Sequence, residues 1–255
     1  MEFIEQHLRF VVLHWIRCLS LFGTLAVFGT GGSARLAKVG LGVMLGTILS
    51  FTGDPANFDD PGVSPWLAAL AVKEFLLGAV FGYVANLLFA ILQMAGTLVG
   101  EEMGFNMSQV QDPLTGVSVQ VMAHVYESLS IAVFFVAGGP SFVVRMLARS
   151  FQSYAVDEMS LTGDLLVAVS TYTGGIFLAA LEIAAPVFIA MFVVGVVLGV
   201  LAKIAPEMHI MDLAFPLKVG SGLILVLATM PVLLPAIEEL FESWASFMTD
   251  LAGRR

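Results

Sequence analysis

The stretch that decides the fold is residues 201–219, which read LAKIAPEMHIMDLAFPLKV and follow a long, almost entirely apolar run. It gathers two lysines, a histidine, a glutamate, an aspartate and two prolines. Because proline lacks an amide hydrogen, Pro206 and Pro216 interrupt helix on either side of the polar residues. Lys203 and Lys218 can pair with carboxylates there or lie at helix ends, where the dipole favours a cation. The pattern predicts a polar turn between two packed apolar helices.

The composition of the whole chain agrees with helices in a membrane. Of its 255 residues, 58% are hydrophobic and 12% charged, whereas soluble domains average about 45–50% apolar and about 25% charged residues. The length would suit one or two soluble domains. Since several apolar runs are long enough to span a bilayer, we instead predict an all-α membrane protein with one integral membrane domain over residues 1–255.

Charge and cysteine content exclude several classes of function. The chain has 11 Lys+Arg against 20 Asp+Glu and no basic stripe, so nucleic acid is not expected as a partner. Cys18 is the only cysteine, which rules out an intrachain disulfide and a thiolate metal cage. The four histidines lie far apart, and we expect neither a metal site nor a cofactor. The N-terminal segment lacks a basic n-region and a cleavage site, so it is expected to be retained.

Apolar blocks lie at about residues 8–30, 36–51, 66–100, 117–137, 164–204 and 213–236. A bilayer crossing needs about twenty residues. The second block is short, and the third and fifth are long enough to be tilted, kinked or hairpinned helices. Gly174-Gly175 and Pro186 are natural bending points. The blocks are separated by polar segments at 51–65, 101–116, 138–163 and the quoted stretch, so a count of six spans is only nominal.

The distribution of positive charge does not fit simple alternation of these spans. Arg35 and Lys38 would place the first loop inside the cell. Alternation then places residues 101–116, which carry no Lys or Arg, inside, and Arg145 and Arg149 outside. Either the span count is wrong or the helices do not cross the bilayer in the ordinary way.

Glycines recur at four-residue spacing within the apolar blocks. Such pairs let helix backbones approach closely, which favours association where lipid removes the hydrophobic driving force. The alternative is that glycine is common in membrane helices and the spacing is incidental. The pairs are Gly42 and Gly46, Gly78 and Gly82, Gly96 and Gly100, and Gly195 and Gly199.

Ionisable residues within or beside the apolar blocks form a second group. A charge at the centre of a membrane helix costs roughly 2.5–3.5 kcal/mol, so these residues should face protein or water and find partners. They could form a proton or ion path, or structural ion pairs between helices or subunits. We favour ion pairs because the residues are scattered. They are Arg17, Arg35, Lys73, Glu74, Glu127, Glu182, Lys203 and Lys218.

The segment 101–116, EEMGFNMSQVQDPLTG, cannot continue a lipid-facing helix. Irregular backbone in hydrocarbon leaves peptide groups unpaired unless protein or water surrounds it, so the segment lies outside the membrane or lines a cavity. Its methionines are flexible and conform to irregular surfaces. It could therefore seal a pore reversibly, or it could be an ordinary surface loop.

Signatures of enzymes are weak. Ser221 between two glycines, together with His209, only superficially resembles the pair that an intramembrane serine protease needs. A metalloprotease would need a second histidine one helical turn away, which the sequence HIMD at 209–212 lacks. We expect no enzymatic activity.

Four segments, taken in order, resemble the FliR family of type III secretion export-gate proteins, which has flagellar and virulence-type (SctT-like) members. They are residues 34–42, ARLAKVGLG; residues 96–105 followed by Asp112-Pro113; Ala185-Pro186-Val187; and residues 198–218 with the Ala-Pro and Phe-Pro-Leu-Lys motifs. The resemblance covers essentially the whole chain. Lys203 stands where the family usually has arginine, and Glu207-Met208-His209 replaces a more typical Gln-Met-Asn.

The resemblance implies a non-enzymatic subunit, present once per gate, with kinked helical hairpins in a helical multi-subunit pore. Its partners would be FliP and FliQ homologues, then FlhB and FlhA homologues, membrane lipid, and the unfolded proteins that cross the gate. Such complexes look lifted above the usual membrane plane, which would explain the charge pattern. The expected location is the bacterial inner membrane at the flagellar basal body, with energy from the proton motive force and a separate ATPase.

The resemblance also implies that residues 101–116 form the plug that closes the resting pore together with a methionine-rich ring of FliP. The residues expected to act in it are Met103, Gly104, Phe105, Met107, Asp112 and Pro113. A virulence-type gate subunit is an alternative within the family. A secondary transporter is an alternative of another class, but residues 1–127 and 128–255 lack the matched halves such proteins commonly show. An intramembrane hydrolase comes third.

Overall fold

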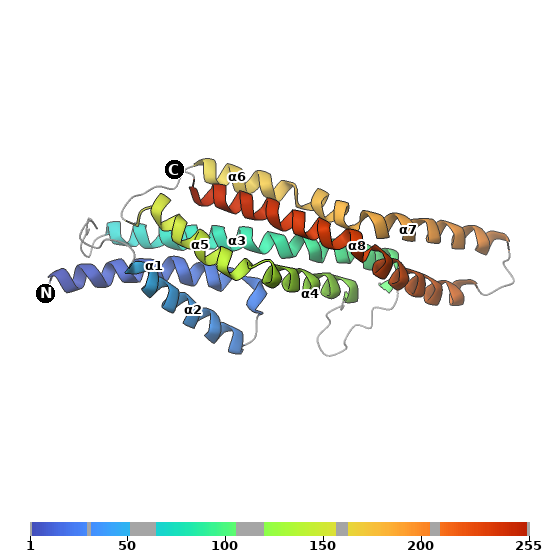
Figure 1. Ribbon diagram of the computed structural model, residues 1–255, viewed down its shortest axis with the longest axis horizontal. Helices are drawn as coiled ribbons and strands as arrows, with labels where there is room; N and C mark the ends of the chain where they lie inside the picture. Colours follow the sequence, from blue (N-terminus) through green and yellow to red (C-terminus); the bar gives the residue numbers. More distant parts are fainter. Residues whose placement is uncertain are drawn as a thin grey trace. The chain divides into compact units, whose positions relative to one another are not determined.

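The computed structural model describes residues 2–29, 32–51, 65–105, 120–156, 163–204 and 210–253. Over these residues the chain is helical without any strand, which confirms the predicted all-α fold (Figure 1). The elements are α1 (Glu2–Thr24), a 3-10 turn η1 (Ala26–Phe28), α2 (Gly32–Ser50), α3 (Pro65–Glu102), α4 (Val121–Val136), α5 (Gly139–Ser153), α6 (Gly163–Gly174), α7 (Ile176–Ile204) and α8 (Ile210–Gly253). Met107, Asp112, Pro113 and His209 lie outside the described residues.

The chain groups into two compact units. The first comprises Met1–Leu87, Gly138–Thr173 and Ser243–Arg255, and the second Leu88–Ala137 and Gly174–Glu242. Helices α3 and α8 each contribute residues to both units. A single domain over residues 1–255 stays a prediction.

In the first unit, α2 packs along α1 (Figure 1). The Trp15 indole on α1 donates a hydrogen bond to the Thr47 hydroxyl on α2, with Nε1 2.9 Å from Oγ1. Apolar side chains of α1 and α3 without exposed surface fill the interior beside them. They include Leu21, Leu70, Leu77 and Phe81.

The second unit is built around one apolar cluster from four helices. The C-terminal half of α3 supplies Leu92, Ala95 and Val99, and α4 supplies Met122 and Tyr126. The rest of the cluster comes from α7 and α8, with Ala180, Ala184, Val187, Met191, Val226, Leu233 and Ile237 among them.

Within the described ranges, four helical stretches are long and apolar enough to span a membrane: Gly32–Ser50, Pro65–Glu102, Gly163–Ile204 and Ala214–Gly253. The number is five if α4 and α5 count as one bent span. In α3 61% of the most apolar window is buried inside the chain, against 22% in both of the last two stretches. Helix α3 is therefore an interior helix, while α6–α7 and α8 present apolar surface outward.

The structure corrects the sequence reading at three places. Pro216 was expected to interrupt the helix, but it lies inside α8, which begins at Ile210. Residues 138–163 were predicted as a loop, but α5 covers Gly139–Ser153, with Val143, Met146, Leu147 and Ser150 buried. The last block was expected to end near residue 236, but α8 runs to Gly253. Both additions are amphipathic helices, whose polar faces hide them from a search for uniformly apolar runs.

Of the two predicted bending points, one interrupts the helix. Helix α6 ends at Gly174 and α7 begins at Ile176, so the break falls on Gly175. Pro186 instead lies inside a continuous α7. Neighbouring groups in membrane helices can compensate for the amide that proline lacks.

Candidate functional site

Three of the candidate ionisable residues form one buried cluster in the first unit. Arg17 of α1 and the adjacent Lys73 and Glu74 of α3 have no exposed surface. The Arg17 guanidinium donates to both carboxylate oxygens of Glu74, with Nε 2.5 Å from Oε2 and Nη2 2.8 Å from Oε1. The Lys73 ammonium lies 2.9 Å from Glu74 Oε1. Two cations thus share one carboxylate.

The excess positive charge of this cluster faces three backbone carbonyls of residues 154–156, directly after the C-terminal end of α5. Arg17 Nη2 donates to the Tyr154 carbonyl at 2.8 Å, and Lys73 Nζ donates to the Ala155 and Val156 carbonyls at 2.6 Å and 3.1 Å. The partial negative charge at a helix C-terminus stabilises cations placed there. The Arg17 guanidinium also lies 4.1 Å from the centre of the Phe151 ring. The cluster therefore joins α1, α3 and α5, and each of its three charged groups has a partner within it or among these carbonyls.

The other ionisable candidates are not drawn into this cluster. Glu127 accepts a contact from His124 on the same helix, with Nδ1 3.2 Å from Oε2. Lys218 is half-buried. The remaining three, Arg35, Glu182 and Lys203, are exposed and form no ion pair with any residue in the described ranges.

Three of the four glycine pairs lie where another helix approaches. A Cβ on Gly42 or Gly46 would come within 2.8 Å of Leu19 Cδ2 or 2.7 Å of Trp15 Cδ1, both on α1. Gly78 and Gly82 of α3 meet α1 more tightly still, against the backbone carbonyls of Arg17 and Leu21 and the hydroxyls of Ser20 and Thr24.

The third and fourth pairs lie in the second unit. A Cβ on Gly96 would be 2.6 Å from the Met122 carbonyl oxygen of α4, and one on Gly100 3.2 Å from Met122 Cβ. On Gly195 it would be 3.5 Å from Lys218 Nζ. At Gly199 a Cβ would meet nothing within 4 Å, so this glycine makes no close helix contact within the described part of the chain.

The candidate gating residues begin where α3 ends. Met103 has no exposed surface and belongs to the apolar cluster of the second unit, and Phe105 packs against that cluster. Between them Gly104 has a φ of +80°, a conformation that glycine adopts without steric cost. The irregular backbone after α3 therefore starts packed against helices and not in open solvent.

Sequence reasoning missed what Met103 packs against. A Cβ on Gly222 of α8 would lie 2.5 Å from Met103 Cγ, 2.6 Å from Cε and 2.9 Å from Sδ. One turn earlier, the stem of Lys218 approaches the same turn, with Cδ 3.9 Å from the Cβ position of Gly104. Gly222 had been read only as a flank of Ser221, and no local pattern connects α8 with the end of α3.

The hydroxyl of Ser221 is occupied within its own helix. It donates to the Leu217 carbonyl at 2.6 Å and lies 3.9 Å from Met191 Sδ. Across the described ranges, no group of three or more His, Cys, Asp or Glu side chains is placed to hold a metal ion.

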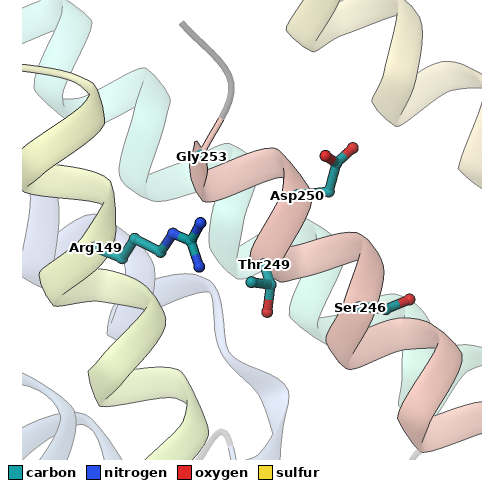
Figure 2. Close-up of a pocket in the computed structure, with 5 residues that line it drawn as sticks. All are labelled: Arg149, Ser246, Thr249, Asp250 and Gly253. Carbon is teal, nitrogen blue, oxygen red and sulfur yellow. The ribbon is translucent and has the colours of Figure 1, made fainter.

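An open pocket of about 430 Å³ lies at the end of α8, lined by Arg149, Ser246, Thr249, Asp250 and Gly253. Figure 2 shows Arg149 reaching from α5 toward the last turn of α8. A Cβ on Gly253 would lie 3.3 Å from Arg149 Nη2. A cation is favourable at a helix C-terminus. Arg149 of α5 therefore lies where its charge is favourable, at the C-terminal end of α8.

Comparison with known proteins extends over nearly the whole chain. Residues 8–244 match the model of a family described as bacterial export proteins, family 1. The flagellar biosynthetic protein FliR of Escherichia coli (strain K12) is 27% identical, over 97% of this chain and 95% of that protein. FliR of Bacillus subtilis (strain 168) is 25% identical, over 94% and 93%. The surface presentation of antigens protein SpaR of Salmonella typhimurium is 25% identical, over 70% and 67%.

These matches confirm the resemblance to FliR and its virulence-type counterparts seen in the sequence motifs. They also agree with the all-helical fold and its apolar, membrane-suited helices. The chain belongs to the bacterial export proteins, family 1.

Proposed function

We propose that this chain is a non-enzymatic subunit of a type III protein export gate, through which unfolded proteins cross the bacterial inner membrane. Membership of an export-protein family over residues 8–244 supports this function. So do relatives named for flagellar biosynthesis that align with 97% and 94% of the chain.

The gate forms with other subunits, namely homologues of FliP and FliQ around one copy of this chain, with homologues of FlhB and FlhA beside them. The outward apolar surface of α7 and α8 supports such neighbours. Soluble monomeric proteins rarely expose a contiguous apolar surface of this extent, so lipid or other protein subunits must cover these two helices. Among these side chains are Ile189, Phe192, Val196, Val200, Leu217, Ile224 and Leu227.

The segment 101–116 closes the resting pore. The observation that carries this proposal is Met103, which lies at the start of the segment and is completely buried in the core of the second unit. This burial holds the beginning of the segment against the helices of the second unit. Met103, Gly104 and Phe105 therefore anchor the segment, and Met107, Asp112 and Pro113 continue it.

We assign the gate to the flagellar system and its basal body, because the FliR relatives align over more of the chain than SpaR does. Expression in a motile bacterium whose own fliR gene is deleted should restore swimming. Rescue of a virulence-type secretion mutant instead of the flagellar one would reverse the assignment.

The plug is tested by deleting Met103 to Met107 in a strain that makes the full set of gate subunits. Entry of a small impermeant dye into the cells should increase, because the resting pore would stay open. Deletion of residues 56–60, five residues from another polar segment, is the matched control and should leave dye entry unchanged. Co-purification with FliP and FliQ homologues verifies assembly in both strains, and an assembled deletion variant without a leak would refute the plug.

The same co-purification separates a gate from a secondary transporter. A gate subunit should bring FliP and FliQ homologues with it from native membranes. A stable solitary protein that moves a small solute unaided would exclude the gate.

A further inference from the structure

We propose that Gly222 is the seat of Met103, and that the pore opens when the Met103 side chain leaves this notch on α8. The inference rests on the proposed role of segment 101–116 as a plug. It adds Gly222 as a residue that positions the plug, and it names the contact that must break.

The contact between the two residues is close along the whole methionine side chain. Cγ, Sδ and Cε of Met103 would all lie within 2.9 Å of a Cβ on Gly222. Real Cβ atoms do not come so near to other heavy atoms. Any residue larger than glycine at position 222 therefore competes with Met103 for the same space, and only glycine admits the methionine as it lies here.

The contact differs in kind from the other tight glycine contacts. At Gly78, Gly82 and Gly96 the atoms met include backbone carbonyl oxygens of a neighbouring helix, which cannot move without moving that helix. At Gly222 all three nearest atoms belong to one flexible side chain. A Cβ there should displace Met103 while the helices keep their places.

Met103 lies at the point where helix gives way to irregular chain. Its amide donates to the Val99 carbonyl at 3.0 Å, and the Gly104 amide donates to the Glu101 carbonyl at 3.0 Å. These bonds tie the methionine to α3, and the left-handed conformation of Gly104 then redirects the chain. The Met103 side chain can therefore leave the notch by rotation about its own bonds without melting α3, while the chain after it moves about Gly104.

Lys218 flanks the same seat. It stands four residues before Gly222, which places both on one face of α8. Its Cδ lies 3.9 Å from the Cβ position of Gly104, and its Nζ lies 3.5 Å from that of Gly195 on α7. The Lys218 side chain thus lies beside the turn at Gly104. Because Gly104 and Gly195 have no side chains, there is room for the lysine between them.

The strength of this contact suits a reversible closure. Full burial of a methionine side chain favours the seated form by about 10- to 150-fold. That bias keeps a resting pore closed, and a translocating chain can overcome it. The seat should therefore control how often the pore opens and should have little effect on whether the gate assembles.

The test places a side chain at position 222 in the complete gate. Gly222→Leu should increase dye entry by about tenfold, as expected for an unseated methionine. Gly220→Leu is the matched control, because a Cβ at Gly220, two residues away on α8, meets nothing within 4 Å. The swap Met103→Ala with Gly222→Met should refill the notch from the opposite side and return dye entry toward the wild-type rate.

The deletion of Met103 to Met107, run in parallel, separates this inference from the plug itself. A leaking deletion variant together with an assembled, tight Gly222→Leu variant would overturn the seat and leave the plug standing. If neither variant leaks, both proposals are wrong.

A second variant keeps the inference testable if Gly222→Leu fails to assemble. Cysteines replacing Met103 and Gly222, in a chain with Cys18→Ala, are within disulfide reach because a Cβ at 222 lies 2.5 Å from Met103 Cγ. Oxidation should block export, and a reductant should restore it. Continued export by the fully crosslinked gate would show that opening does not require Met103 to leave Gly222. Failure of the two cysteines to crosslink would show that residue 103 does not lie against residue 222.

Discussion

The guanidinium of Arg17 on α1 and the carboxylate of Glu74 on α3 form a two-point ion pair, at 2.5 Å and 2.8 Å, without any exposed surface on either side chain. Lys73, which directly precedes Glu74 in α3, shares the same carboxylate at 2.9 Å. Because Glu74 has two cationic partners and Arg17 has one anionic partner, replacing Glu74 should cost more stability than replacing Arg17.

Glu74→Gln should destabilise the protein more than Arg17→Met. Without the carboxylate, Arg17 and Lys73 are both buried without a counter-charge, whereas without Arg17 the pair of Lys73 and Glu74 remains. Removing one partner of a buried pair costs about 3–5 kcal/mol, and we expect Glu74→Gln at the upper end of that range. Thermal unfolding of the purified gate in detergent measures both. Arg35→Met, at an exposed position without an ion pair in the described ranges, is the control. Equal losses for Glu74→Gln and Arg17→Met would contradict the argument from two buried cations and one carboxylate.

The crossing of α1 and α3 depends on glycine at position 82. In Gly82→Ala the new Cβ would overlap the Thr24 hydroxyl and lie 2.7 Å from the Leu21 carbonyl oxygen, and overpacking of this kind costs about 1–3 kcal/mol. Gly40→Ala on α2 meets nothing within 4 Å and should stabilise its helix by about 0.5–1 kcal/mol. The two variants should shift the unfolding temperature in opposite directions, and a shift of the same sign would disprove the close crossing.

Trp244 anchors the C-terminal part of α8. Its indole Nε1 donates to the Val84 carbonyl at 3.0 Å, and the side chain has no exposed surface. Trp244→Ala should cost about 3–5 kcal/mol through the cavity it leaves, and Trp244→Phe about 0.5–1.5 kcal/mol through the lost hydrogen bond to Val84. Trp66→Ala, at a half-exposed tryptophan, is the comparison in the same unfolding assay. Similar losses at positions 66 and 244 would argue against a buried anchor.

A substitution at Gly199 can distinguish helix packing within this chain from packing against partner subunits. A Cβ at Gly199 meets nothing within 4 Å in the described part of the chain. Gly199→Leu should therefore leave the stability of the isolated protein unchanged while lowering the yield of FliP and FliQ homologues that purify with it. Gly195→Leu should also reduce assembly, but it additionally displaces Lys218. If both leucine variants assemble normally, the four-residue glycine spacing on α7 is incidental.

Ser221→Ala should leave export at the wild-type level. The Ser221 hydroxyl donates to the Leu217 carbonyl of its own helix, so this hydrogen bond accounts for the side chain. Swimming of the complemented fliR deletion strain gives the readout. Complete loss of swimming with normal assembly would revive a nucleophilic role.

The sequence predicts the parts of this fold that depend on local pattern. The long apolar run at 66–100 became α3, and Gly174-Gly175 marked the break between α6 and α7, because both features act through the chain itself. The amphipathic α5 and the last turns of α8 were missed for a related reason. Buried residues such as Met146 and Trp244 alternate there with polar ones, and average hydropathy cancels the signal.

The contacts between distant residues could not be predicted in the same way. Arg17 and Glu74 were recognised as charges that needed partners, but nothing in the sequence pairs them with each other or with carbonyls at the end of α5. The notch at Gly222 is less visible still, because a glycine shows only that space is available and not which side chain fills it.

Pro231 and Pro235 lie inside α8, four residues apart and therefore on one face, and both are exposed. Each lacks the amide that would bond the carbonyl four residues earlier, so the carbonyls of Leu227 and Pro231 have no i+4 donor in their helix. Fatty acyl chains cannot supply a hydrogen. A neighbour that brings a hydroxyl, an amide or a bound water molecule to this face of α8 can supply the hydrogen bonds that the two proline amides cannot.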